Sequence, residues 1–149
     1  MVSLGLQESD CDIIRKNDLS RGGHVKDNEA LDIAHWKLRL TAFARERDWE
    51  KFHTPKNLAM ALSVEASELL ELFQWLTAEE SLRLPSEVGQ EKLRRDIKRE
   101  MADVLVYLLR LATVLDIDLD EALSVKMMEN EKKYPADKVK GKAKKYDQY

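Results

Sequence analysis

Hydrophobic residues recur at intervals of three and four over three long spans of the chain that contain neither Gly nor Pro. These spans are residues 24–54, 56–84 and 90–134. Such spacing is typical of amphipathic helices rather than strands. It predicts four helices, at about residues 28–47, 54–77, 88–115 and 118–135. The expected fold class is therefore all-α, a four-helix bundle formed by one domain.

Two of the predicted helices begin at recognisable capping residues. Thr54 followed by Pro55 places a capping hydroxyl and a first-turn proline at the start of the second helix. Asp118 with Glu121 three residues later resembles a capping box at the start of the fourth. The loop before Thr54, residues 48–53, is unusually aromatic for a loop.

Composition narrows the possible classes of protein. Hydrophobic residues make up 44% and charged residues 36% of the 149, and the five Gly and three Pro argue against an all-β barrel or sandwich. The net charge of −3 does not suggest a nucleic-acid coat, and no apolar run approaches the roughly 20 residues that cross a bilayer. A lone cysteine, Cys11, excludes a disulfide framework, and the N-terminus lacks a signal-peptide pattern. We expect a cytoplasmic protein without nucleic-acid or membrane partners.

Charge and periodicity divide the chain into three parts. Residues 1–27 are polar and unperiodic and are predicted to form a mobile N-terminal arm, followed by a helical domain at 28–135 and a lysine-rich tail at 136–149. Residues 132–149 carry seven Lys against two Asp, whereas the rest of the chain has a net charge of −8. The tail therefore either contacts an anionic ligand or is simply solvated.

Two pairs of carboxylates stand beside the apolar stripes of the second and third helices. The second helix carries a leucine stripe with a gap of seven residues, and Glu65 occupies that gap with Glu68 one turn later. In the third helix Glu100 and Asp103 border the stripe. The stripe residues are Leu58, Leu62, Leu69, Leu72 and Leu76, then Ile97, Met101, Val104, Leu108, Leu111 and Leu115. Residues three apart project to one side of a helix, so facing helices would bring four carboxylates together.

Four carboxylates in one pocket repel each other unless a cation binds them. An all-oxygen ligand set suits Mg²⁺ or Mn²⁺. The three histidines lack the helical spacing of a zinc or di-iron site. Two interpretations remain open at this point, a magnesium site or plain salt bridges with neighbouring basic residues. Those basic residues are Arg94, Arg95, Lys98 and Arg99.

Four segments carry a resemblance to a known family. They are F-A-R-E-R-D-W-E-K-F-H at 43–53, E-A-S-E-L-L-E-L-F-Q-W at 65–75, E-M-A-D-V-L-V-Y at 100–107 and K-M-M-E-N-E-K-K-Y-P at 126–135. In this order the sequence resembles the all-α nucleoside triphosphate pyrophosphatases of the MazG-like superfamily, most closely the dCTP pyrophosphatase branch. The resemblance covers about residues 36–135, nearly the whole predicted domain.

The resemblance implies hydrolysis of dCTP, or modified dCTP, to dCMP and pyrophosphate, as in cleaning of the nucleotide pool. It implies a homotetramer, a dimer of dimers, and Mg²⁺ as cofactor with Mn²⁺ as a possible substitute. Carried over position by position, the implied catalytic and metal-binding residues are Glu65, Glu68, Glu100 and Asp103. The implied substrate-binding residues are Trp49, Phe52, His53, Trp75, Tyr107, Lys126 and Asn130.

Three alternatives to this function stay open. Leu40 stands where close dCTP-preferring relatives carry histidine, and leucine packs against a base without hydrogen bonding to it. That departure favours a broader MazG-type dNTP pyrophosphatase as the first alternative. The second is a phosphoribosyl-ATP pyrophosphatase, which shares the acidic skeleton. The third lies outside the enzymes, a non-catalytic helical interaction module whose acidic cluster is salt-bridged.

Overall fold

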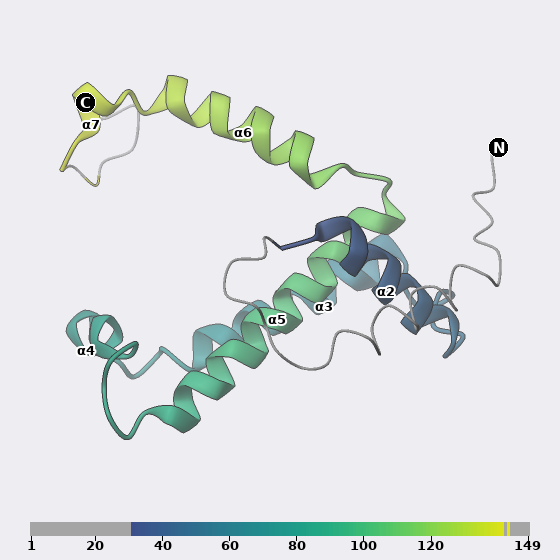
Figure 1. Ribbon diagram of the computed structural model, residues 1–149, viewed down its shortest axis with the longest axis horizontal. Coiled ribbons are helices and arrows are strands. Elements are labelled where there is room, and N and C mark those ends of the chain that lie inside the picture. Colours follow the sequence, from purple (N-terminus) through teal and green to yellow (C-terminus); the bar gives the residue numbers. More distant parts are fainter. Residues whose placement is uncertain (1–30, 142, 144–149) are drawn as a thin grey trace. The chain divides into compact units, whose positions relative to one another are not determined.

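The computed structural model describes residues 31–141 and 143, and every regular element among them is a helix. The helices are α2 (Ile33–Arg45), α3 (Pro55–Glu71), α4 (Ala78–Arg83), α5 (Glu91–Val114), α6 (Leu119–Lys133) and α7 (Ala136–Val139), shown in Figure 1. The predicted all-α class is confirmed. No helix in this part of the chain is both long enough and apolar enough to cross a membrane.

The chain divides into two compact units, residues 1–111 and 112–149, which we describe separately. The described part of the first unit holds α2, α3, α4 and most of α5, and the second unit holds α6 and α7. The predicted arm at residues 1–27 lies outside the described residues, and the predicted tail at 136–149 begins with the single turn of α7.

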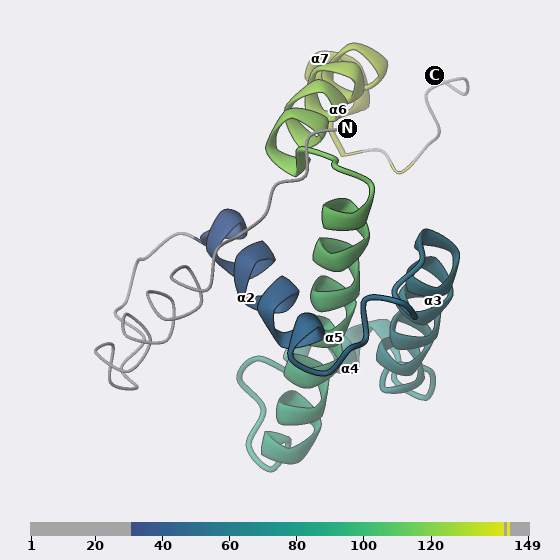
Figure 2. The same ribbon diagram turned by 90° about the vertical axis from the view of Figure 1, so that its right-hand side faces the viewer.

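Within the first unit α2 and α3 flank α5 in the view of Figure 2. A hydrogen bond of 2.9 Å from Arg110 Nη1 to Thr41 Oγ1 joins α5 to α2. Arg94 stabilises the link between α4 and α5, because its Nη1 donates to three carbonyl oxygens of that link at 3.1 to 3.3 Å. They belong to Leu84, Pro85 and Glu87. Buried apolar side chains form a small core. They are Ala44, Leu58, Leu84 and Leu109.

Thr54 and Asp118 are confirmed as N-caps, although at Asp118 the structure shows the cap without the return bond from Glu121 that completes a capping box. Thr54 Oγ1 accepts a hydrogen bond from the backbone N–H of Asn57 at 3.3 Å, with Pro55 in the first turn of α3. Asp118 Oδ1 accepts from the backbone N–H groups of Asp120 at 2.9 Å and Glu121 at 3.1 Å at the start of α6.

Three helix boundaries differ from the prediction. The second helix ends at Glu71 rather than Thr77, because Thr77 and Glu80 form a capping box that begins α4. The Thr77 hydroxyl accepts from the Glu80 N–H at 3.2 Å, and the Glu80 carboxylate accepts from the Thr77 N–H at 2.8 Å. The first helix starts at Ile33, since Asp32 caps it, and the third starts at Glu91 rather than at residue 88.

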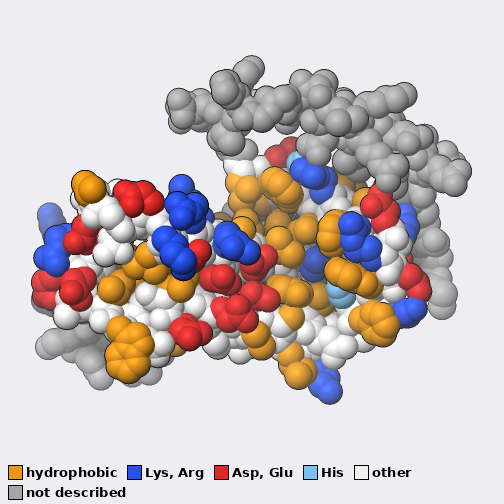
Figure 3. Space-filling model, turned by 90° about the horizontal axis from the view of Figure 1, so that it is seen from below, with side chains coloured by type: hydrophobic (Ala, Val, Ile, Leu, Met, Phe, Trp, Pro, Cys, Tyr) orange, Lys and Arg blue, Asp and Glu red, His pale blue; other side chains and the backbone are white. Residues whose placement is uncertain are grey.

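Large hydrophobic side chains remain exposed on the described helices. No residue of the predicted stripe of the third helix is fully buried, and Met101 is 57% exposed. The buried apolar side chains of α5 are instead Leu109 and Ala112, which lie beside that stripe. The wide apolar arc of α5 has more surface than the neighbouring helices cover. Figure 3 shows hydrophobic side chains spread over one face, with acidic side chains gathered among them.

Candidate functional site

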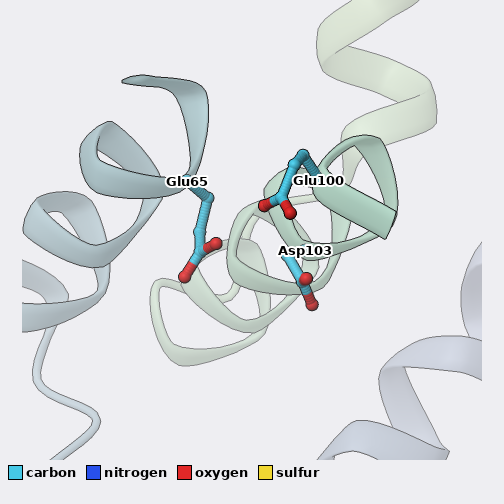
Figure 4. Close-up of side chains that lie close together, drawn as sticks. All are labelled: Glu65, Glu100 and Asp103. Carbon is cyan, nitrogen blue, oxygen red and sulfur yellow. The ribbon is translucent and has the colours of Figure 1, made fainter. Parts of the chain in front are cut away.

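Three carboxylates from two helices meet in the first unit. Glu65 of α3 and Glu100 and Asp103 of α5 each offer an oxygen atom, and these atoms all lie within 4.8 Å of one another. Figure 4 shows Glu65 of α3 on one side of the space between the two helices and Glu100 and Asp103 of α5 on the other. The sequence pattern explains this meeting, since Glu65 occupies a position of the leucine stripe that packs toward α5.

The cluster carries uncompensated negative charge. Burial raises the pKa of Glu65 above its ordinary value, and the negative charges of Glu68, Asp103 and Glu100 raise it further. Among the described residues no Lys or Arg forms an ion pair with Glu65, Glu100 or Asp103. The salt-bridge interpretation of this cluster therefore finds no support in the described structure, and a bound cation would relieve the repulsion.

Glu68 lies outside the group of three, although its charge acts on Glu65. It follows Glu65 by one turn of α3, and its side chain is exposed. The structure thus brings together three of the four carboxylates that the sequence singled out.

A pocket of about 430 Å³ opens beside the carboxylates. Five residues named from the sequence line it together, which are Trp49, His53, Glu65, Asp103 and Tyr107. Its apolar wall comes from Leu40 and Phe43 of α2 and Val106 of α5. All of these residues belong to the first unit. The pocket therefore combines an acidic end with an aromatic and aliphatic interior.

The end of α2 places Trp49 over the pocket. Asp48 adopts a left-handed backbone, with φ of 53°, and the Trp49 N–H donates to the carbonyl oxygen of Ala44 at 3.0 Å. This is the hydrogen bond of a Schellman motif, in which the residue after the left-handed position packs back on the helix. Accordingly, the Trp49 ring meets Phe43 edge to face, with centroids 5.9 Å apart.

A second turn carries the chain from Trp49 to His53 and α3. The N–H groups of Phe52 and His53 both donate to the Trp49 carbonyl oxygen, at 2.9 and 3.1 Å. The His53 ring lies 6.3 Å from that of Trp49, and its Nδ1 is buried without a hydrogen-bond partner among the described residues. Desolvation, followed by the positive charge of Arg110, holds the pKa of His53 below its ordinary value. The lowered pKa favours the neutral form of the imidazole that lines the pocket.

Four other residues named from the sequence do not line this pocket. Phe52 is 58% exposed and Trp75, beyond the end of α3, is 86% exposed. Lys126 and Asn130 lie on α6 in the second unit. There the Lys126 ammonium bonds to the carboxylate of Glu129 at 3.1 Å.

Sequence reasoning missed one charged residue of the pocket, Arg110. Its side chain lines the cavity although the residue is only 4% exposed, and desolvation lowers its pKa below the ordinary value. A signal was available, since Glu100, Asp103, Tyr107 and Arg110 follow at intervals of three, four and three. These intervals place all four on one side of α5.

The chain is similar to known proteins over much of its length. The model of the MazG-like family matches residues 60–148. The chain is 44% identical over 104 residues to dCTP pyrophosphatase 1 of Rattus norvegicus and 44% identical over 105 residues to that of Homo sapiens. Each match covers 70% of this chain and 59% of the relative, so the chain spans about three fifths of the length of these curated relatives.

A solved structure is similar over a larger share of its own length. The crystal structure of a pyrophosphatase from Archaeoglobus fulgidus matches with 40% sequence identity and a TM-score of 0.61. The match covers 74% of this chain and 99% of that one.

Proposed function

The chain belongs to the MazG-like family, and we propose that it is a nucleoside triphosphate pyrophosphatase that hydrolyses dCTP to dCMP and pyrophosphate. The observation that carries the proposal is the group of three carboxylates at the edge of an aromatic pocket. The names of the curated relatives support dCTP as the substrate, and the similarity to an archaeal pyrophosphatase supports the type of reaction.

The residues present fit a divalent cation. Glu65, Glu100 and Asp103 supply three oxygen donors within 4.8 Å of one another, and burial together with the neighbouring negative charges raises the pKa of Glu65. Oxygen donors of this kind suit Mg²⁺, and Mn²⁺ as a substitute. We assign these three as metal ligands and Glu68 as a fourth carboxylate that adds negative charge one turn away.

Bound Mg²⁺ supplies charge neutralisation at the phosphate oxygens, orientation of the α-phosphorus and a lowered pKa of an attacking water. The protein contributes carboxylates from two helices (Figure 4), which would hold the triphosphate through the metal at one end of the pocket. A carboxylate of the cluster that is not fully engaged accepts the proton of the attacking water. Tyr107, one turn beyond Asp103, lines the same pocket, which supports a role for its hydroxyl near the sugar or phosphates.

The interior of the pocket suits a nucleobase. Trp49 and His53 offer flat faces for stacking, a contact worth about 1–3 kcal/mol per base in other nucleic-acid sites. Leu40, Phe43 and Val106 add apolar contacts. Because Leu40 has no hydrogen-bonding group, selectivity among bases has to come from another side chain of the pocket.

A homotetramer, a dimer of dimers, is part of the proposal. The support is the exposed apolar surface of the single chain. It includes Leu70 on α3, Met101 on α5 and Trp75 beyond the end of α3. A second copy would cover such a surface. Trp75 then lies at an interface, from which it reaches the nucleotide of a neighbouring subunit. Lys126 and Asn130 are proposed to contact phosphate or sugar oxygens, and the cytoplasm is the proposed location.

Pyrophosphate release from each of the four dNTPs tests the proposal, measured with Mg²⁺ and with EDTA. We expect metal-dependent release that is greatest with dCTP. In Asp103→Asn the rate falls to the level measured in EDTA, while Glu71→Gln, an exposed acid on α3 outside the cluster, retains the wild-type rate.

Each other outcome changes the assignment. Equal rates on several dNTPs keep the metal site but move the function to a broad-specificity pyrophosphatase. Release from phosphoribosyl-ATP and from no dNTP replaces the proposed substrate. If no substrate releases pyrophosphate and Asp103→Asn changes neither metal response nor rate, the acidic cluster is structural and the proposal is wrong.

A further inference from the structure

Arg110 is a buried cation without an ion-pair partner in the described structure. The residue is 4% exposed, and none of the ion pairs between described residues includes it. Burying an unpaired charge is costly, and proteins normally pair such a group or place it against a ligand. The guanidinium lines the pocket of the candidate site, so a ligand in that pocket would contact it.

The hydrogen bonds of Arg110 leave most of its donors unused. A guanidinium carries five N–H groups. Within residues 31–141, Nη1 donates to Thr41 Oγ1 at 2.9 Å, and Nε is buried without a partner. The Thr41 hydroxyl itself donates to the carbonyl oxygen of Lys37 at 2.8 Å, so its oxygen is free to accept from Arg110. This relay holds the guanidinium in place while leaving N–H groups for another acceptor.

The second buried polar atom without a partner in the described residues belongs to the same pocket. It is Nδ1 of His53. Buried polar side chains in native proteins are almost always hydrogen-bonded. Both atoms are shielded from a ligand in the open pocket, so the donors of Arg110 that remain for such a ligand are the N–H groups of Nη1 and Nη2.

The position of Arg110 on α5 identifies the part of the ligand that it meets. Arg110 follows Asp103 by seven residues, which is about 10 Å along a helix. In the proposed function the carboxylate cluster is the triphosphate end of the pocket. Arg110 lies two turns beyond it, where its hydrogen bond to Thr41 joins it to α2, the helix that also supplies Leu40 and Phe43. Two helical turns correspond to the separation between the phosphates of a nucleotide and the far edge of its base. Arg110 consequently faces the base rather than the phosphates.

The fork of a guanidinium matches two adjacent acceptors. The pairing edge of cytosine offers such a pair, the O2 and N3 atoms. Uracil and thymine carry a hydrogen on N3, which would oppose an N–H donor. Adenine places its amino donor next to a ring-nitrogen acceptor, so it offers no two adjacent acceptors to the fork. Guanine offers a pair at O6 and N7, as in the arginine contacts of DNA-binding proteins.

We propose that Arg110 is the residue that selects cytosine, by donating two N–H groups to O2 and N3 of the base, with Thr41 as the residue that positions its guanidinium. This inference rests on the proposed function, because it assigns the base end of the same site. It makes Arg110 the source of selectivity that Leu40 cannot supply.

The test compares kcat/KM for dCTP and dUTP in the wild type, Arg110→Met and Arg110→Lys. Arg95→Met, an exposed arginine on the same helix, is the matched control. We expect Arg110→Met to lower the ratio of dCTP to dUTP by about tenfold to a hundredfold, the discrimination that one bidentate pair supplies. Arg110→Lys keeps the charge without the fork and lowers the ratio as well, whereas Arg95→Met leaves it unchanged. Thr41→Val gives a smaller loss in the same direction.

Binding of dCMP and dUMP, measured by calorimetry on the same variants, separates this inference from the proposed function. If the wild type hydrolyses no dNTP, the proposed activity fails, while a preference for dCMP that Arg110→Met abolishes still supports the Arg110 assignment. An unchanged ratio in folded Arg110→Met, or wild-type selectivity in Arg110→Lys, overturns it. An equal fall for every nucleotide, or a preference for dGTP that depends on Arg110, overturns it too.

Discussion

Replacing Glu65 by glutamine is expected to stabilise the metal-free protein and to weaken its response to Mg²⁺. The side chain keeps its size but loses the charge that Glu100 and Asp103 repel across less than 4.8 Å. At that separation one pair of charges repels by about 1 kcal/mol in water and about 3 kcal/mol at an effective dielectric constant near 20. Because these side chains are partly or fully exposed, the lower value applies.

Because Glu65 repels both Glu100 and Asp103, we expect the free energy of unfolding to rise by about 2 kcal/mol in EDTA at pH 7, or about 6 °C in melting temperature for a chain of this length. The pH dependence follows from the raised pKa of Glu65. An acid whose pKa is higher in the folded state binds more protons there, so stability falls as the pH rises from the unfolded pKa through the folded one. The wild type loses stability across that window, and Glu65→Gln loses less.

Thermal unfolding followed by circular dichroism measures both effects, between pH 4 and 8 in EDTA and then against Mg²⁺ concentration. Saturating metal at one hundred times its dissociation constant stabilises a protein by about 2.7 kcal/mol, and the variant should gain less because it has lost a ligand. Glu71→Gln is the control on the same helix. A metal-free Glu65→Gln that melts below the wild type, or an equal Mg²⁺ response in both proteins, would refute the reasoning.

Three further substitutions test the fold that holds the site, each by urea unfolding. Leu58→Ala is expected to lower the free energy of unfolding by about 2–5 kcal/mol, because this side chain is 1% exposed and its loss leaves a cavity. Asp48→Gly is expected to raise it by up to about 1 kcal/mol, since glycine adopts the left-handed backbone at this position without a steric penalty. Arg94→Met is expected to lower it by about 1–3 kcal/mol, because three carbonyl oxygens of the link between α4 and α5 lose their donor.

Each of these expectations has a contrary result. A loss below about 1 kcal/mol in Leu58→Ala would mean that the core around α3 is loosely packed. Destabilisation by Asp48→Gly would mean that the aspartate side chain stabilises the fold by more than the left-handed backbone at this residue costs. No loss in Arg94→Met, with Arg95→Met as the control, would mean that the link is held by other contacts.

The acidic cluster was predictable because the period of an α-helix determines which residues of the sequence share one face of that helix. A seven-residue gap in the leucine stripe identified Glu65, and the three-residue spacing of Glu100 and Asp103 placed both on one side of the next helix. The capping residues Thr54 and Asp118 were predictable for a similarly local reason, since an N-cap involves hydrogen bonds within one turn.

The break after Glu71 was missed although its signal was present. Leu72 and Leu76 continue the leucine stripe, so periodicity predicts that the helix runs on to Thr77. The Thr77 and Glu80 side chains instead capture backbone N–H groups and begin α4. Local hydrogen bonds of a capping box therefore override apolar spacing in this link.

The spacing of residues within one helix does not predict the distance between separate elements. The motif containing Lys126 and Asn130 belongs to a second compact unit, and a pattern within α6 says nothing of its distance from α3. Trp75 was expected to line the pocket, yet it lies beyond the end of α3 with 86% of its surface exposed. Where the helix ends decides which way this ring points, and that end was itself mispredicted.

One stripe of α5 holds both ends of the proposed site. From Glu100 through Asp103 and Tyr107 to Arg110 it spans about 15 Å and changes from anionic to cationic side chains. In the two proposals, the acidic end holds a divalent cation and, through it, the phosphates, and the basic end meets an uncharged base that has acceptor atoms. Because a rigid helix fixes the separation, a substitution at Arg110 alters the choice of base without moving the carboxylates. Selectivity and chemistry can therefore be changed separately in this protein, and the two sets of variants, at Arg110 and at the cluster, should affect different kinetic quantities.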